Sequence, residues 1–112
     1  MEHLILFCTC PDANSAERIA EALVDRRFAA CVNIVPGIKS VYRWQGQRES
    51  AQEVLLLIKS SDELYPLLEQ MIRDIHPYEL PEIIAVPVKR GLAPYLAWIG
   101  TSLMVNERNG KS

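Results

Sequence analysis

Three cysteines and two histidines carry the most distinctive chemistry in this sequence of 112 residues. Cys8 and Cys10 are separated by one residue, and alternate residues of an extended strand point to the same face. Thiolates and imidazoles suit copper and zinc, so a metal site is the better chemical interpretation of this pair. The structural alternative stays open, because free cysteine often behaves as a small buried hydrophobe.

The other chemically distinctive residues lie further along the chain. Cys31 follows two alanines and precedes a valine, so we expect it in the core. His76 stands before Pro77 at the expected end of a helix, where an imidazole can interact with the helix dipole. That capping role and metal binding both remain open for His76. Tyr78 and Glu79 follow in a loop bounded by prolines, and such loops often carry function.

Motifs of the common enzyme classes are absent from the sequence. It contains no glycine-rich nucleotide-binding loop, no nucleophile elbow and no zinc-protease helix motif. An acylphosphatase would need a loop of backbone donors, whereas Thr9-Cys10-Pro11-Asp12 loses one donor at Pro11 and places a carboxylate at Asp12. We therefore expect neither catalysis nor an organic cofactor.

The composition narrows the class of protein. Twelve basic and fourteen acidic residues leave a formal charge of -2, which disfavours binding to nucleic acid. An odd, small number of cysteines favours reduced thiols and a cytoplasmic location. No apolar run approaches the roughly 18 residues of a membrane span, so no membrane association is expected.

The hydrophobic periodicity predicts the elements that must position these residues. The order is β-α-β-β-α-β with an additional helix, which is typical of an α+β, ferredoxin-like sandwich. We expect one domain over residues 1–105 and a polar tail over 106–112. The expected strands cover 4–8, 31–44 with a bend or bulge at Pro36-Gly37, 54–59 and 83–88, and the helices cover 14–25, capped at Asn14-Ser15, 64–75, capped by Ser60 to Glu63, and 92–103.

Both faces of the expected sheet are apolar. Leu4 and Leu6 point one way and Ile5 and Phe7 the other, yet two long helices can cover only one face. A second copy of the chain is the simplest cover for the other face, so we predict a homo-oligomer. The aromatic pairs Tyr42/Trp44 and Tyr95/Trp98 favour subunit contacts over base stacking, because no basic stripe accompanies them.

Five short segments, taken in their order and spacing, resemble a known protein family. Each is weak alone, but together they extend from about Leu4 to Leu103. The segments are Cys8-Thr9-Cys10-Pro11-Asp12, Ala29-Ala30-Cys31-Val32-Asn33, Tyr42-Arg43-Trp44-Gln45-Gly46, Glu53-Val54 leading to Lys59, and His76-Pro77-Tyr78-Glu79-Leu80-Pro81-Glu82-Ile83. In these residues the sequence is similar to the CutA divalent-cation tolerance proteins.

The resemblance implies a homotrimer with the architecture of PII signalling proteins and a role in tolerance of copper and other divalent ions. It implies a copper ligand at Cys8, a second thiol position at Cys31, and a histidine pair that here reads Ile75-His76. Glu53 or Glu79 could add a carboxylate, although copper(II) and zinc prefer at least four donors. Because Cys8 ends a strand and His76 ends a helix, a shared site requires their approach across a cleft.

A second hypothesis is a signalling or scaffold trimer that binds a small ligand or a protein in clefts between subunits. Trp44, Lys59, Tyr78 and Glu79 would then line the cleft.

Overall fold

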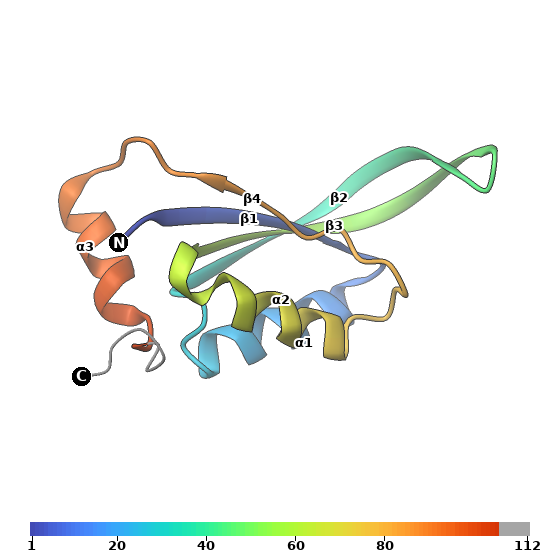
Figure 1. Cartoon of the computed structure of the whole chain (residues 1–112). Helices are drawn as coiled ribbons and strands as arrows, with labels where there is room; N and C mark the ends of the chain where they lie inside the picture. The colour runs from blue at the N-terminus through green and yellow to red at the C-terminus, as the bar shows by residue number, and fades with distance from the viewer. Residues whose placement is uncertain (106–112) are drawn as a thin grey trace.

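The computed structural model describes residues 1–105, and the predicted polar tail at 106–112 lies outside the described residues. Residues 1–105 form a four-stranded antiparallel sheet in the order β2-β3-β1-β4, with three α-helices (Figure 1). This confirms the mixed α+β class and the ferredoxin-like order of elements. The elements are β1 (His3–Cys10), α1 (Ala13–Asp25), β2 (Cys31–Trp44), β3 (Gln47–Ser61), a 3-10 helix (Asp62–Leu64), α2 (Tyr65–Ile75), β4 (Ile84–Pro87) and α3 (Ala93–Ser102).

The first helix is capped by Asp12 and not by the predicted box at Asn14-Ser15. The Asp12 carboxylate accepts hydrogen bonds from the Ser15 backbone N–H at 2.8 Å and from the Ser15 hydroxyl at 2.9 Å. These bonds stabilise the ionised carboxylate and lower the pKa of Asp12. The sequence prediction failed because Asn14 and Asp12 are both favourable N-cap residues.

The second helix also begins differently from the prediction. Ser60 and Ser61 do not cap it, because β3 continues through both residues. The Ser60 hydroxyl instead donates to the carbonyl of Phe28 at 2.6 Å. A 3-10 turn follows, and Pro66 lies in the first turn of α2, where a missing N–H is tolerated as expected.

Strands β2 and β3 form a hairpin that extends well beyond the helices (Figure 1). The predicted bulge is confirmed, because the register shifts between Val35 and Ile38 and Gly37 has a φ of 79°. At the tip, Gln45 and Gly46 have φ values of 51° and 80°, as a two-residue primed turn requires.

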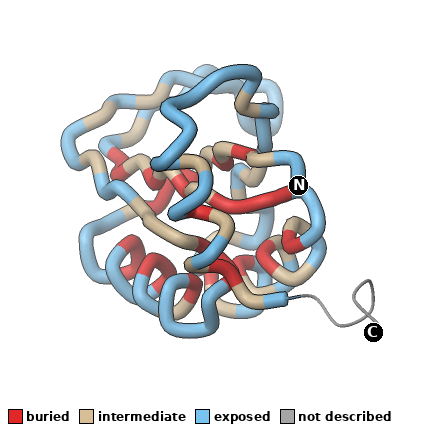
Figure 2. Tube along the Cα trace, turned by 90° about the vertical axis from the view of Figure 1, so that its left-hand side faces the viewer, coloured by how far each residue is buried: buried red, intermediate tan, exposed pale blue. Residues whose placement is uncertain are grey.

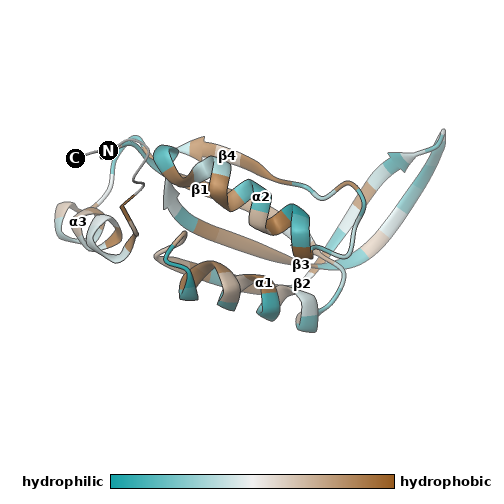
Figure 3. Cartoon of the chain, turned by 60° about the horizontal axis from the view of Figure 1, so that its bottom comes forward, coloured by the Kyte–Doolittle hydropathy of each residue, from teal (hydrophilic) through white to brown (hydrophobic). Residues whose placement is uncertain are grey.

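The third strand is longer than predicted. It begins at Gln47, whereas the sequence pattern predicted a start near Val54. Residues 47–50 are exposed, so that part of the hairpin has no buried face to impose an alternation of apolar and polar residues. Figure 3 shows the corresponding contrast between the polar outer hairpin and the apolar β4.

Helices α1 and α2 cover one face of the sheet, and the core lies between these helices and the sheet (Figure 1). Alternate residues of the two central strands point into it, and Figure 2 shows the buried residues concentrated in the interior of the chain. The buried apolar residues of these two strands are Leu4, Leu6, Cys8, Cys10, Val54, Leu56 and Ile58.

The opposite face of the sheet has no helix over it within the described residues. Its side chains come from the other alternation of β1 and β3 and from the edge strand β4. Ile5, Phe7, Leu55 and Leu57 are half-buried, while Ile84 and Val86 are 56% and 43% exposed. The prediction that one chain leaves an apolar sheet face uncovered is therefore confirmed. No helix among residues 1–105 is both long enough and apolar enough to cross a membrane.

Candidate metal centre

Cys8, Cys10 and His76 converge at one end of the core. Their possible ligand atoms all lie within 4.8 Å of one another, and all three residues are buried. The two thiols reach this point because Cys8 and Cys10 lie on the helix-facing side of β1, as their spacing predicted. His76 reaches it because α2 ends at Ile75 beside the same strand.

Both ring nitrogens of His76 are hydrogen-bonded. Nδ1 accepts the backbone N–H of Tyr78 at 3.0 Å, so the ring proton lies on Nε2, which donates to the carbonyl of Thr9 at 2.8 Å. The ring thus joins β1 to the loop after α2, while the backbone N–H of His76, the C-cap residue of α2, donates to the carbonyl of Ile72 at 2.8 Å. A metal ion at His76 would replace one of these two bonds.

The two thiols of the cluster share a hydrogen bond, and this makes them unequal. The hydrogen bond with Cys10 and burial raise the pKa of Cys8, whereas the same bond lowers the pKa of Cys10 because it stabilises the Cys10 thiolate. The interaction of the two thiols therefore favours one thiolate within the cluster, and the thiolate is the form that binds metal.

Two sulfurs and one imidazole nitrogen form a donor set that fits a soft or borderline cation. Soft thiolates select copper(I) and zinc, while magnesium and calcium require oxygen ligands. Structural zinc takes four protein ligands, and the cluster provides three. The donor set therefore fits copper(I) better than copper(II) or structural zinc.

The structure differs from the predicted ligand set in two respects. Cys8 and His76 meet within one chain, with no need for an approach between subunits. Cys10 belongs to the cluster, as the spacing of the Cys8/Cys10 pair indicated, although the family resemblance did not imply it as a ligand. The sequence could not show that the end of α2 packs against the same face.

Cys31 lies away from the cluster. Contrary to the prediction, it is not a core residue. It pairs with Lys59 on the uncovered face of the sheet and is half-buried. Lys59 Nζ lies 3.9 Å from the Cys31 sulfur and donates to the side chain of Asn33. The prediction failed because Cys31 begins β2 on the face that α1 and α2 do not cover.

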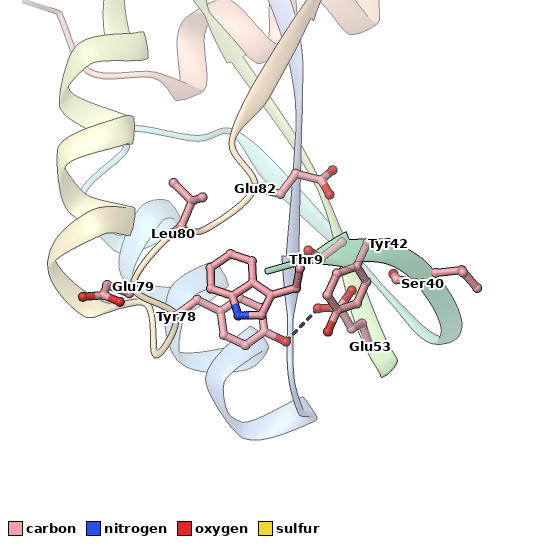
Figure 4. A pocket seen from close by; sticks show the side chains of 10 residues that line it. Thr9, Ser40, Tyr42, Glu53, Tyr78, Glu79, Leu80 and Glu82 are labelled. Carbon is pink, nitrogen blue, oxygen red and sulfur yellow. Dashed lines mark hydrogen bonds between the residues drawn. The ribbon is translucent and has the colours of Figure 1, made fainter. Parts of the chain in front are cut away.

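Glu53 also lies outside the cysteine and histidine cluster. Its carboxylate accepts a 2.7 Å hydrogen bond from the Tyr78 hydroxyl, and the residue is 8% exposed (Figure 4). Burial and the neighbouring Glu53 raise the pKa of Tyr78, so this phenol remains a neutral donor. Glu53 thus holds the loop after α2 against β3.

Glu53 and Tyr78 line a cavity of about 620 Å³ between the hairpin and this loop. Three of the four predicted cleft residues, Trp44, Tyr78 and Glu79, belong to its lining, whereas Lys59 does not. The cavity is lined by Thr9, Ser40, Val41, Tyr42, Trp44, Glu53, Tyr78, Glu79, Leu80 and Glu82 (Figure 4).

Comparison with known proteins reveals close relatives in sequence. The Thermus thermophilus divalent-cation tolerance protein CutA is 48% identical over 99 residues, which is 88% of this chain and 95% of that protein. Mouse protein CutA is 48% identical over 93 residues, which is 83% of this chain. The chain matches only about half of the mouse relative, 52% of its length.

Solved structures agree with the sequence comparison. The crystal structure of CutA1 from Oryza sativa has a TM-score of 0.92 and 37% identity, covering 95% of this chain and 97% of that one. The family model described as CutA1 divalent ion tolerance protein matches residues 4–102. The chain belongs to the CutA1 divalent ion tolerance family.

Proposed function

We propose that this protein binds copper, or another thiophilic cation, at Cys8, Cys10 and His76, and that it takes part in tolerance of metal ions without catalysis. The observation that carries the proposal is the convergence of three buried donors within 4.8 Å. The names of the relatives as divalent-cation tolerance proteins support it. Free thiols persist in a reducing compartment, so we place the protein in the cytoplasm.

Isothermal titration of the reduced protein with copper(I) tests the site. We expect Cys8→Ala and Cys10→Ala each to weaken binding at least tenfold, since even the loss of an outer-shell partner costs roughly 10–100-fold. Cys31→Ala is the matched control and should bind as wild type does, because Cys31 lies on the other face. Wild-type affinity in both Cys8→Ala and Cys10→Ala would overturn the proposal.

We also propose that the protein acts as a homotrimer. The uncovered face with Ile84 and Val86 supports association of copies, and the family resemblance implies three. Analytical ultracentrifugation should give three times the chain mass of 12.7 kDa. A species of one chain mass at micromolar concentration would contradict this.

A second candidate function is a signalling or scaffold trimer with a ligand in the cavity beside the hairpin. The volume of about 620 Å³ favours it, since it falls in the range of small-molecule sites. A titration of Trp44 fluorescence with small molecules would test this function, and its failure would leave the metal site unaffected.

A further inference from the structure

The cavity beside the hairpin combines acidic and aromatic side chains and has no basic residue in its lining. Three glutamates and three aromatic residues belong to it, together with smaller polar and aliphatic groups. The acidic and aromatic residues are Glu53, Glu79, Glu82, Tyr42, Trp44 and Tyr78. Both kinds of side chain attract positive charge, the carboxylates directly and the rings through their electron-rich faces.

Glu53 is the most informative of these residues, because it is more than nine-tenths buried at 8% exposure. One carboxylate oxygen of Glu53 accepts a hydrogen bond from the Tyr78 hydroxyl at 2.7 Å. No lysine or arginine within residues 1–105 forms an ion pair with it. With no basic side chain in the cavity lining, this carboxylate attracts a cation from solution.

The aromatic residues favour a cation that carries apolar groups. Within the single chain Tyr42 and Trp44 are 44% and 49% exposed, so no other part of residues 1–105 covers their rings fully. In Figure 4, Tyr42 and Tyr78 lie next to the Glu53 carboxylate, while Glu82 approaches from the side of the last strand. Such a set of rings around a carboxylate is typical of sites for ammonium groups with apolar substituents.

A hard metal ion fits this cavity less well. Calcium takes six to eight oxygen ligands and magnesium six in a near-ideal octahedron. Here one carboxylate is buried, Glu79 points away from it in Figure 4, and aromatic rings fill the intervening wall. The volume of about 620 Å³ also suits a small organic molecule better than a single ion.

We propose that this cavity binds a small organic cation, an ammonium ion whose charge faces Glu53 and whose alkyl groups contact Tyr42, Trp44 and Tyr78. The proposal rests on the second candidate function, a ligand-binding cavity, and is independent of the thiol cluster. Binding requires no metal and no covalent step. The ligand would bridge the hairpin and the loop after α2, the two parts of the chain that form the cavity walls.

Fluorescence titration of the full-length chain tests the proposal. The sequence contains two tryptophans, so Trp98→Phe leaves Trp44 as the only reporter, inside the cavity. In this background the probe is tetramethylammonium chloride, with potassium chloride at the same ionic strength and tert-butanol as controls for salt and for uncharged alkyl groups. We expect a saturable change with tetramethylammonium alone.

Two variants with matched controls locate the site. Glu53→Gln keeps an acceptor for Tyr78 but removes the charge, and should weaken binding roughly tenfold, as the loss of a charged partner predicts. Glu21→Gln on the exposed side of α1 should have no effect. Tyr42→Leu should also weaken binding, whereas Tyr95→Leu on α3 should not.

Three results would overturn the proposal. They are no saturable signal with tetramethylammonium, equal binding of tert-butanol, or wild-type binding in both Glu53→Gln and Tyr42→Leu. Equal binding of tert-butanol would overturn the cation proposal but leave the second candidate function, a ligand-binding cavity, in place. The copper titration is unaffected by any of these results, so failure here is distinguishable from failure of the metal site.

Discussion

The hydrogen bond between Tyr78 and Glu53 allows a quantitative test of how the loop after α2 is held. Tyr78→Phe removes the hydroxyl and leaves Glu53 without its 2.7 Å donor. Glu53 is 8% exposed, so water replaces that donor poorly. Hydrogen bonds to charged groups contribute about 1.5–3 kcal/mol, and we expect the free energy of unfolding to fall by that amount.

A second tyrosine–glutamate pair provides the control. Tyr65 donates to Glu69 at 3.0 Å one turn along α2, and both residues are partly exposed. Water can solvate Glu69 after Tyr65→Phe, so the loss there should stay below about 1 kcal/mol. Each variant deletes one phenolic hydroxyl. The two variants differ mainly in how deeply the glutamate that accepts its hydrogen bond is buried.

Urea denaturation at one fixed protein concentration measures both losses, because the stability of an oligomer depends on concentration. The difference between Tyr78→Phe and Tyr65→Phe should exceed the uncertainty of the extrapolation. A loss in Tyr78→Phe no larger than that in Tyr65→Phe would refute the reasoning.

The same pair predicts a dependence on alkaline pH. Burial raises the pKa of Tyr78 in the folded chain above that of an unfolded tyrosine, which is about 10. The stabilisation is therefore fully present below pH 10 and is lost as the pH rises beyond it, because the unfolded phenol ionises first. The difference in stability between wild type and Tyr78→Phe should narrow above pH 10.

Three further predictions concern the elements that position the site. Leu56→Ala in the core should lower the free energy of unfolding, measured by urea denaturation, by about 2–5 kcal/mol. Leu80→Ala, at 74% exposure, should change it by less than about 0.5 kcal/mol. Equal losses in the two variants would contradict the assigned core. Gly46→Ala should cost about 1–2 kcal/mol, because its φ of 80° disfavours any side chain, and an unchanged midpoint would argue against the primed turn. Asp12→Ala should lower the melting temperature at neutral pH but not at pH 2. The reason is that the pKa of Asp12 is lowered in the folded chain, so the stabilisation by its ionised cap is lost as the pH falls below about 4. An equal decrease of the melting temperature at both pH values would exclude the ionised cap.

Periodicity predicted the fold well where one side of an element is buried. The stripe of α2 and the alternation in β1 depend on contact with the core, and the structure has both. The outer hairpin lacks this constraint, so the exposed residues 47–50 gave no strand signal. The helix starts were harder to place, because several polar residues compete for each cap and the tertiary contact of Ser60 with Phe28 decides one of them.

The candidate site was only partly predictable for a related reason. Spacing along one strand showed that Cys8 and Cys10 share a face, but only packing of α2 brings His76 to that face. Glu53 precedes the core-facing Val54 in β3, so the alternation of the strand turns it to the other side of the sheet, where Tyr78 donates to it. Cys31 seemed a core residue from its apolar neighbours, yet its alternation puts it on the uncovered face beside Lys59.

The position of β1 in the centre of the sheet has a consequence for biosynthesis. Both strands that pair with it, β3 and β4, are synthesised later, so the nascent β1 has no partner for its apolar residues until they emerge. During that interval Cys8 and Cys10 are open to solvent, whereas in the finished fold both are at 0% exposure. A metal ion that reaches these thiols during synthesis would meet no barrier from α2, and the fold would then close over it.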